Sequence, residues 1–469
     1  MIKEVISLNL IFNPMVKEQL HNCYIVPTEH KKSIYAGIEI ELPIINLRCE
    51  AADFDVVHDL TRSFGSHFDF AIDKNDDAGN PLFLIDRRTG DIFTFDCSYN
   101  TLEISLGMVD NLHDANARLM LYLDFIQNYL HKQDHTVAGF GINPHQKYNN
   151  NIPIQNGRYR MLFHHLLSYK KYLGQKTFSP YPAFGMFAAA SQVQLDILPG
   201  KLIQTLKVFN ALEPFKSVLF ANSPLDQEGL LLARDRLWAD SMHGFNPRNT
   251  GAHDPVPSTI DELLEYMLDC SIYCTERAGK YYNFTPTPLR EYFTRQKITA
   301  EYFADGDYHT EDFAPVLEDL QYFRTFKFQD PTFRGTVEFR SVCSQPLREC
   351  LTTAAFHLGL IGRLDELDEL LTQDSSLYGH GFSAVELRGM LNREIWPNFI
   401  ELAALRKTLL NILAIAKDSL RTRGKNEEVF LTPLFDRADQ LLSPAREYIS
   451  RLSTGEKIET LILDYAALR

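Results

Sequence analysis

The segment Tyr35–Leu42 (YAGIEIEL) constrains this chain more than any other, because acidic and aliphatic residues alternate in it with the period of a β-strand. Successive side chains of a strand point to opposite faces, so Glu39 and Glu41 share one face, about 7 Å apart, and the aliphatic residues between them occupy the other. We expect the strand to end at Pro43. Taken alone, a strand of this kind favours a solvent-facing edge over the wall of a site.

The same pattern recurs in segments that are far apart in the sequence. Asp96 lies in TFDCS, Glu103 in TLEISL and Glu338 in TVEFRSV, each flanked by strand-forming residues. If these strands are neighbours, their carboxylates converge, and like charges about 5 Å apart repel by roughly 3 kcal/mol at an effective dielectric constant of about 20. Hard cations, Mg²⁺ or Mn²⁺, neutralise such clusters, and protein-bound Mg²⁺ often accompanies nucleotide phosphates.

Polar side chains on two other strands fit this prediction. Three of them share one face of a strand predicted at Phe187–Ile197: Gln192, Gln194 and Asp196. They either supply oxygen ligands or line an exposed strand, and the sequence leaves both interpretations open. Arg340 follows Glu338 by two positions and therefore points to the same face, where it forms a simple ion pair or holds a transferring phosphoryl group.

Two further arginines are associated with a long loop. Residues 243–259 are rich in Gly, Pro, Asn and His, and a loop of this length within a compact protein is often functional. Arg248 lies in the loop, and Arg234 precedes it. Salt bridges on a helix surface could account for Arg234, and the neighbouring loop is what favours a phosphate-binding role for it.

The remaining periodicity predicts a mixed α and β fold, more antiparallel than doubly wound. A pair of strands is expected at Asp91–Asp96 and Thr101–Leu106, and helices at Asp110–His131 and Leu202–Phe220, the second broken at Pro214. Thr336–Val342 is the last predicted strand, and the pattern is almost wholly helical from about Cys350. We therefore expect a catalytic domain at 1–349 and a helical segment at 350–469 packed on it.

Composition and motif searches exclude several classes of function. The net charge of −14, without any basic run, argues against binding to nucleic acid or to an anionic membrane. No Walker-type phosphate loop, nucleophile elbow or H-E-x-x-H helix is present, and GFG at residues 139–141 is too short for a dinucleotide fingerprint.

Cellular location is also predicted from the sequence. The N-terminal MIKEVISLNLIFNPM lacks a small-residue cleavage site, and no run of about 18 apolar residues occurs, so we expect a cytoplasmic protein without a signal peptide or transmembrane helix. Seven scattered cysteines indicate reduced thiols. Cys270 and Cys274 are interpreted as packing residues, because a zinc site would need further partners at suitable spacing.

Together these motifs resemble the plant-type branch of the glutamate-cysteine ligases, within the glutamine-synthetase-like carboxylate-amine ligases. GIEIEL at Gly37–Leu42 is similar to the family's glycine-acid-x-acid strand, and Asp96 and Glu103 lie where the family has its second pair of acids. The other matching segments follow in the family's order: GFGINPH from Gly139, IPIQNGRYRML at Ile152–Leu162, SQVQLDI at Ser191–Ile197, LFANSP at Leu219–Pro224, ARDRLWAD at Ala233–Asp240, YMLDCSIYCTER at Tyr266–Arg277 and VEFR at Val337–Arg340.

The resemblance implies a curved, mainly antiparallel sheet with helices on its outer face and the site on its concave face. It implies ATP and Mg²⁺ (or Mn²⁺) as cofactors and the following metal-binding residues: Glu39, Glu41, Asp96, Glu103, Gln192 and Glu338. Arg340 and Glu41 are the implied catalytic residues. The implied nucleotide- and substrate-binding residues are Gln192, Gln194, Arg234 and Arg248.

The implied reaction is ATP-dependent amide formation between the γ-carboxylate of glutamate and the amine of cysteine through γ-glutamyl phosphate, the first step of glutathione biosynthesis. Three features depart from the plant branch: Asp96 replaces a glutamate, SVCSQP at Ser341–Pro346 replaces a glycine-rich stretch, and the loop before Arg248 is longer. Three alternatives therefore stay open: another amine acceptor, phosphoryl transfer to a guanidino or carboxyl group, or a catalytically silent nucleotide binder.

Overall fold

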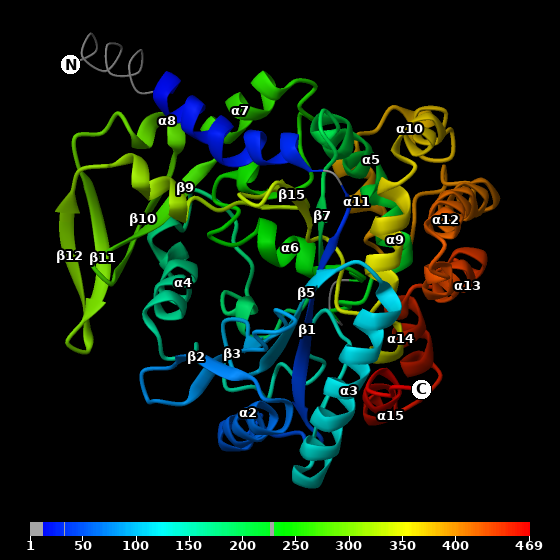
Figure 1. Ribbon diagram of the computed structural model, residues 1–469, viewed down its shortest axis with the longest axis horizontal. Coiled ribbons are helices and arrows are strands. Elements are labelled where there is room, and N and C mark those ends of the chain that lie inside the picture. Colours follow the sequence, from blue (N-terminus) through cyan, green and yellow to red (C-terminus); the bar gives the residue numbers. More distant parts are fainter. Residues whose placement is uncertain (1–12, 32, 226–228) are drawn as a thin grey trace.

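The computed structural model describes residues 13–31, 33–225 and 229–469. The segment 1–12, on which the signal-peptide prediction rests, lies outside the described residues. A nine-stranded sheet whose paired strands are all antiparallel forms the centre of the molecule (Figure 1). The strands follow in the order β14 (Gln329–Pro331), β15 (Thr336–Phe339), β7 (Ser191–Asp196), β1 (Ala36–Asn46), β5 (Thr101–Val109), β4 (Ile92–Phe95), β3 (Pro81–Ile85) and β2 (Ala71–Asn75), and β6 (His135–Val137) pairs with the end of β1.

The register of this sheet brings the acidic strands together, as their sequence patterns predicted. Glu41 of β1 lies opposite Glu103 of β5, and Glu39 lies opposite Gln192 of β7. On the far side of β7, Gln194 lies opposite Glu338 of β15. Residues from four separate parts of the sequence therefore occupy neighbouring positions, and the predicted pairing of β4 with β5 is also confirmed.

Two predicted breaks are wrong, and both involve proline. β1 runs through Pro43 to Asn46, because Pro43 lies where the neighbour on one side of β1 changes from β7 to β6, so its missing N–H leaves no gap in either ladder. Helix α5 (Leu202–Phe220) likewise continues through Pro214. Almost every residue in its second half is buried, and this packing outweighs the roughly 3 kcal/mol that an interior proline costs.

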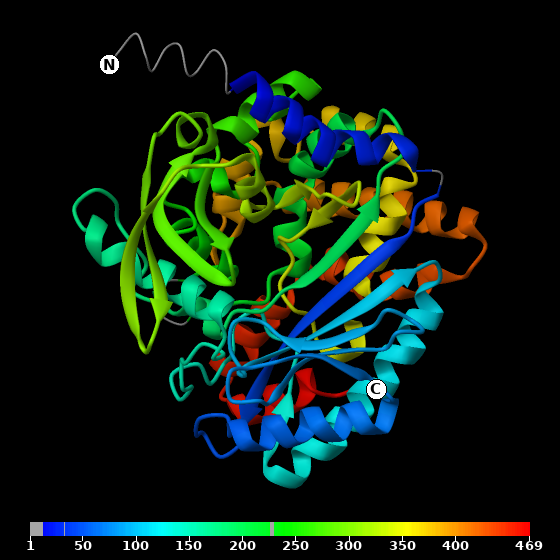
Figure 2. The same cartoon turned by 60° about the vertical axis from the view of Figure 1, so that its left-hand side comes forward.

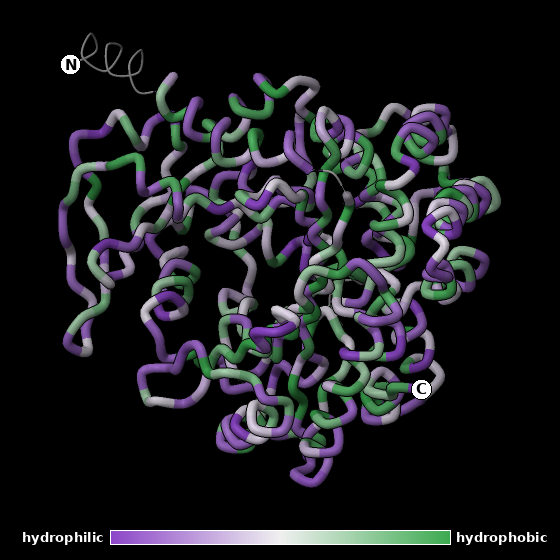
Figure 3. Tube along the Cα trace, in the orientation of Figure 1, coloured by the Kyte–Doolittle hydropathy of each residue, from purple (hydrophilic) through white to green (hydrophobic). Residues whose placement is uncertain are grey.

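A layer of helices covers the aliphatic face of β1, whose Ile38 and Ile40 belong to the main hydrophobic core (Figure 1). α9 (Thr352–Ile361) contacts β1 and β7 and packs against α12 (Leu402–Arg423). The remaining helices of this layer are α10 (Leu364–Thr372), α11 (Ala384–Leu391) and α13 (Thr432–Gln440). In Figure 3 the outer helices α10 and α12 carry both hydrophilic and hydrophobic colours, as expected for helices that bury one face.

The last two helices lie at the other end of β1. α14 (Pro444–Ser453) and α15 (Ile458–Tyr465) supply Tyr448, Leu461 and Tyr465 to a small core that includes Ile45 of β1. Among the described residues beyond Cys350, the regular elements are all helices, as predicted. α2 (Phe54–Phe68) and α3 (Leu112–Leu130) pack beside β3 and β5, and the second confirms the helix expected at Asp110–His131.

A second, four-stranded sheet lies across from the acidic face of the first (Figure 2). It consists of β9 (Ser271–Arg277), β10 (Lys280–Pro288), β11 (Ile298–Ala304) and β12 (Asp307–Phe313), and α4 (Gly157–Leu167) packs on β10. The predicted loop at 243–259 holds a short strand, β8 (Thr250–Gly251), which pairs with β13 (Phe326–Lys327). The helix α6 (Ala233–Ala239) contacts β8, and α7 (Ile260–Asp269) contacts α8 (Leu289–Tyr292).

Cys270 and Cys274 do not share a helix face: Cys270 ends α7 and Cys274 lies in β9. Both are buried free thiols within hydrophobic clusters, which agrees with their interpretation as packing residues. Among the described helices, none has the combination of length and apolar character needed to span a bilayer.

Candidate active site

A cavity of about 800 Å³ lies over the acidic face of the central sheet. The predicted residues that line it are Glu39, Glu41, Asp96, Glu103, Gln192, Gln194, Arg234, Glu338 and Arg340. The strand period explains the arrangement, since each strand turns its alternate polar residues to this side and its aliphatic residues to the helical layer. The structure therefore brings together nine of the ten site residues that the resemblance implies, drawn from six segments of the chain.

Gln192 lies at the centre of the acidic floor of the cavity. We use this name for the following residues: Glu39, Glu41, Asp96, Glu103, Gln192 and Glu338. Its Nε2 donates to Glu39 Oε1 at 2.5 Å and to Glu41 Oε1 at 2.8 Å. The backbone N–H of Ala190 donates to Glu41 Oε2 at 2.6 Å. The Oε1 atom of Gln192 is buried and has no hydrogen-bond partner among the described residues. A buried acceptor beside two carboxylates fits a bound cation, which would accept its lone pair.

At one end of the acidic floor, Glu338 is paired with Arg340. Gln194 Nε2 donates to Glu338 Oε1 at 2.6 Å, and Arg340 Nε donates to Glu338 Oε2. Among the described residues, Nε is the only side-chain nitrogen of Arg340 that donates to a protein acceptor, so its terminal nitrogens can bind an anion in the cavity. Burial lowers the pKa of Arg340, but the charges of Glu338, Glu39 and Asp330 outweigh burial and raise it, so Arg340 stays protonated.

The pKa values of the other four carboxylates are raised, so positive charge nearby does not balance their burial and mutual repulsion. Burial, followed by the charges of Glu103 and Glu338, raises the pKa of Glu39 well above its ordinary value. Burial and the charges of Asp96 and Glu39 do the same for Glu41. The pKa of Glu103 rises to about 8 through burial and through repulsion by Asp96 and Glu41. Burial also raises the pKa of Asp96. Raised pKa values mean that the charged forms of these carboxylates are disfavoured in the protein alone. A bound cation would stabilise the charged forms.

Basic side chains occupy other parts of the cavity wall. Besides Arg234 and Arg340, the cavity is lined by Lys74, Arg158, Arg324 and Arg334. Arg234, from α6, is buried and donates from Nη1 to the carbonyl of Val342 at 3.5 Å, whereas its Nε has no partner among the described residues. One cavity thus combines an acidic floor suited to metal ions with cations suited to phosphate or carboxylate groups.

Sequence reasoning missed Arg158, Arg324 and Arg334. Arg158 lies in the first turn of α4, behind the N-cap Asn156, whose side chain accepts from Tyr159 N at 2.8 Å. That cap, within the NGRYR segment, was the available signal for a positioned arginine. Arg324 and Arg334 lie near β13 and β14 in segments without regular periodicity, so only the tertiary structure brings them to the cavity.

Arg248 and Asp196 lie elsewhere. Arg248 belongs to the 3₁₀ turn Pro247–Asn249, with its guanidinium 4.9 Å from the ring centre of Tyr266, and does not line this cavity. Its role in substrate binding stays a prediction. Asp196 is at the end of β7 and forms an ion pair with Lys31 at 2.6 Å. Of the three polar residues predicted on that strand face, only the two glutamines reach the cavity.

A smaller cavity of about 410 Å³ adjoins the first and shares Glu338, Arg340, Arg324 and Arg334 with it. It also contains Asp330, whose pKa rises to about 6, mainly because it is buried. The Glu338–Arg340 pair therefore lies between two compartments, which allows one extended ligand or two ligands to meet at this pair.

The chain is similar in sequence to known proteins over most of its length. The profile of glutamate-cysteine ligase family 2 (GCS2) matches residues 35–458. The chloroplastic glutamate–cysteine ligase of Brassica juncea is 23% identical over 368 residues, which cover 76% of this chain and 65% of that enzyme. Ligase B of Oryza sativa subsp. japonica is 23% identical over 445 residues, or 92% of this chain and 80% of that enzyme. The chain thus spans slightly under two thirds of the Brassica enzyme.

Among solved structures, the chain is similar to a glutamate–cysteine ligase from Francisella tularensis, crystallised in complex with AMP. The sequence identity is 14% and the TM-score is 0.48, with 93% of this chain and 88% of that chain covered.

Proposed function

Because this chain belongs to glutamate-cysteine ligase family 2, we propose that it joins the γ-carboxylate of L-glutamate to the amine of L-cysteine with conversion of ATP to ADP and phosphate. The observation that carries the proposal is the convergence of the five predicted carboxylates and several arginines on one cavity. A carboxylate is a poor electrophile at neutral pH. The γ-phosphoryl group of ATP therefore passes first to the glutamate side chain, and the amine then displaces phosphate from γ-glutamyl phosphate.

We assign the metal-holding role to the acidic floor: Glu39, Glu41, Asp96, Glu103, Gln192 and Glu338. Their oxygen donors match the preference of Mg²⁺ and Mn²⁺, and the raised pKa values of Glu39 and Glu41 indicate positions that favour an added cation. Mg²⁺ held by these residues would supply positive charge to balance the negative charge of the transferring phosphoryl group.

Arg340 is proposed to hold the equatorial oxygens of the transferred phosphoryl group. Its Nε is fixed by Glu338, so its terminal nitrogens face the cavity in a defined orientation without a cost of ordering at the moment of transfer. Gln194 holds the other oxygen of Glu338, which makes it a positioning residue for the pair. Arg234, with an unpartnered Nε, is proposed to bind a phosphate or the substrate carboxylate, and Arg248 keeps its role as a predicted substrate-binding residue.

The proposal extends to the domains and to the shape of the central sheet. We propose that residues 1–349 form a glutamine-synthetase-like catalytic domain with a curved sheet and its site on the concave face. Residues 350–469 then support that sheet from its aliphatic side, consistent with the contacts of α9 with β1 and β7. ATP and a divalent cation are the proposed cofactors, and the cytoplasm is the proposed location.

One assay separates this function from its alternatives. The protein is incubated with ATP, Mg²⁺, glutamate and a panel of amines, ADP release is followed, and products are identified by mass spectrometry. ADP release that requires both glutamate and cysteine, with formation of γ-glutamylcysteine, supports the proposal. A different amide indicates another acceptor, a stable phosphorylated product indicates a phosphotransferase, and absence of turnover with nucleotide binding indicates a silent binder.

A matched pair of variants tests the site itself. Glu41→Ala should abolish turnover with an unchanged circular dichroism spectrum, whereas Glu318→Ala, in an acidic residue outside the cavity lining, should keep wild-type turnover. Near-normal activity of Glu41→Ala would remove this residue from the metal-holding set.

A further inference from the structure

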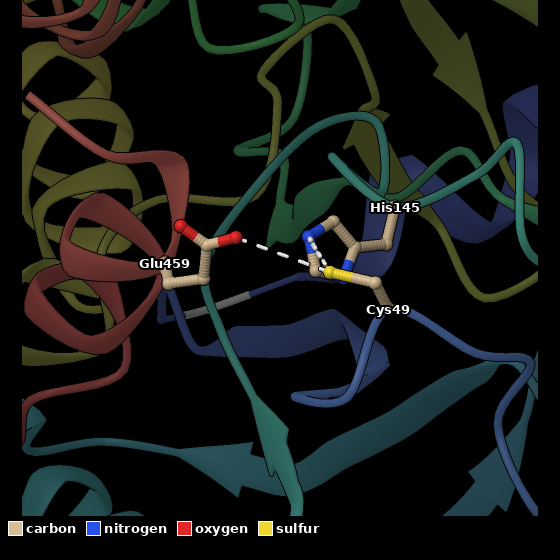
Figure 4. Close-up of side chains that lie close together, drawn as sticks. All are labelled: Cys49, His145 and Glu459. Atoms are coloured by element: carbon tan, nitrogen blue, oxygen red, sulfur yellow. Dashed lines mark hydrogen bonds between the residues drawn. The ribbon is translucent and has the colours of Figure 1, made fainter. Parts of the chain in front are cut away.

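Outside the proposed active site, three side chains of metal-binding type lie close together where the end of β1 contacts the C-terminal helices (Figure 4). They are Cys49 in the turn after β1, His145 in the loop after β6, and Glu459 in the first turn of α15. Cys49 Sγ lies 3.9 Å from His145 Nε2 and 3.9 Å from Glu459 Oε1, and the three ligand atoms all lie within 4.8 Å of one another.

These separations are close to those of a tetrahedral zinc site. Zinc binds sulfur at about 2.3 Å and nitrogen or oxygen at about 2.0–2.2 Å, which places a sulfur and a nitrogen ligand about 3.5 Å apart. The observed 3.9 Å requires only a small side-chain adjustment. A thiolate and a carboxylate also balance the two charges of Zn²⁺, so the bound set is electrically neutral and inexpensive to shield from water.

Asn46, the last residue of β1, prepares two of the three ligands. Its backbone carbonyl accepts from His145 Nδ1 at 3.2 Å, and since a carbonyl only accepts, Nδ1 carries the proton and Nε2 presents a lone pair toward Cys49. Fixing a histidine tautomer through a backbone carbonyl is the usual outer-shell arrangement of metal-bound imidazoles. His145 is 3% exposed, so its ring cannot easily turn away.

The same residue holds the turn that carries the thiol. Asn46 O accepts from Cys49 N at 3.3 Å, Asn46 Oδ1 accepts from Arg48 N at 2.9 Å, and Asn46 Nδ2 donates to Ala51 O at 3.0 Å. Cys49 adopts φ 59°, a left-handed conformation that a side chain other than glycine rarely takes. Arg48 turns its charge to Glu50 and Asp134, at 3.4 and 3.6 Å, so it does not neutralise Glu459.

Ordinary hydrogen bonding explains this cluster less well than a metal does. The thiol has one proton, whereas Nε2 of this tautomer and the Glu459 carboxylate are both acceptors. One donor serves only one of them, and at 3.9 Å a thiol bond is weak. A cation satisfies all three atoms at once.

We infer that Cys49, His145 and Glu459 form a zinc site that ties α15 to the turn after β1, with a fourth position open to water. The apolar contacts of α15 lie beside it, where Leu461 and Tyr465 pack with Ile45 of β1. Because β1 also carries Glu39 and Glu41, zinc at this position links the C-terminal segment to the strand of the acidic floor. The sulfur and nitrogen donors distinguish this site from the all-oxygen floor of the cavity.

The test measures zinc binding by the full chain, stripped of metal by a chelator, in competition with a chromophoric zinc indicator and in excess Mg²⁺. Wild type should bind one Zn²⁺ per chain, and Cys49→Ser and Glu459→Gln should each weaken binding by at least the roughly 10–100-fold that loss of an outer-shell partner costs. Cys23→Ser, a control in another partly buried free cysteine, should bind as wild type does. Glu41→Gln should also retain the site, which separates it from the proposed active site.

Cobalt gives a second readout that does not depend on activity or stability. Co²⁺ added to the metal-free wild type should produce a thiolate-to-cobalt charge-transfer band, which Cys49→Ser should lose and Cys23→Ser should keep. Zinc affinity that is equal in wild type and Cys49→Ser, or a wild type that binds no zinc in excess Mg²⁺, would overturn the inference.

Discussion

Two groups of buried charged side chains adjoin each other, and they differ in whether their acids have cationic partners. In the cavity, four acids have no Lys or Arg ion-pair partner within 4.0 Å among the described residues: Glu39, Glu41, Asp96 and Glu103. Beside the cavity, whose lining includes Asp235, the helices α5, α6 and α11 hold two acids and two bases: Glu213, Asp235, Lys216 and Arg388. The first group needs an outside charge, and the second is complete within the chain.

The second group shows what a structural charge network looks like in this protein. Glu213 is fully buried and accepts from Lys216 at 2.7 Å, Arg388 at 2.7 Å and Ser341 Oγ at 3.1 Å. Arg388 also binds Asp235 through both Nε and Nη2. Every carboxylate there has a cation, so burial of the charges alone does not explain the unpaired acids of the cavity. Their lack of partners is what points to a ligand.

The largest expected effect comes from breaking the paired network. Arg388→Met leaves Glu213 and Asp235 without their shared cation, so the free energy of unfolding in urea should fall by about 3–5 kcal/mol. Arg363→Met, which removes an exposed ion pair with Glu366, should cost less than about 1 kcal/mol. Equal effects of the two substitutions would show that the buried network is not stabilising.

A conservative change in the cavity should affect catalysis and leave folding intact. Arg340→Lys keeps the charge but cannot hold Glu338 through Nε while presenting further nitrogens, so turnover should fall by about 10²–10³-fold. Arg295→Lys, in an exposed arginine near Glu291, is the matched control and should retain wild-type kcat. If Arg340→Lys also retained wild-type kcat, bidentate contact by Arg340 would not contribute to the reaction.

The same substitution should have opposite signs in the two regions. In metal-free protein, Glu39→Gln removes a repelled charge and should raise the free energy of unfolding by about 1 kcal/mol. Glu213→Gln removes the anion that Lys216 and Arg388 share and should lower it. Urea unfolding after chelator treatment measures both, and a loss of stability in Glu39→Gln would mean that its charge is already compensated.

The stability of the metal-free protein should also depend on pH. The pKa of Glu103 is raised to about 8 in the folded chain, above its unfolded value near 4.5, so the folded state binds more protons between these pH values. Stability should therefore fall as pH rises from about 5 to 8. Glu103→Gln should flatten this slope in thermal unfolding experiments, and an unchanged slope would assign the titration to other groups.

Part of this comparison could be predicted from the sequence. The period of two in β1 placed Glu39 and Glu41 on one face, and the same pattern identified Asp96, Glu103 and Glu338. The register that sets Glu41 against Glu103 joins segments about 60 residues apart and follows from tertiary packing.

No sequence pattern predicted the paired network of Glu213, Lys216, Asp235 and Arg388. Glu213 and Lys216 read as ordinary helix residues of α5, and Arg388 comes from a helix far along the chain. The wrong breaks at Pro43 and Pro214 have the same origin, because tertiary structure, which the local sequence does not show, decides whether an element continues through a proline.

The central claim is that the acidic floor holds the metal of a metal–nucleotide complex, and electron paramagnetic resonance of Mn²⁺ tests it most directly. Titration of the metal-free protein with Mn²⁺ and ATP should show protein-bound Mn²⁺ in wild type and in Glu213→Asp, a conservative change in the paired network. Glu41→Gln should lose most of that bound signal while remaining folded. Equal Mn²⁺ binding by Glu41→Gln and wild type would contradict the account.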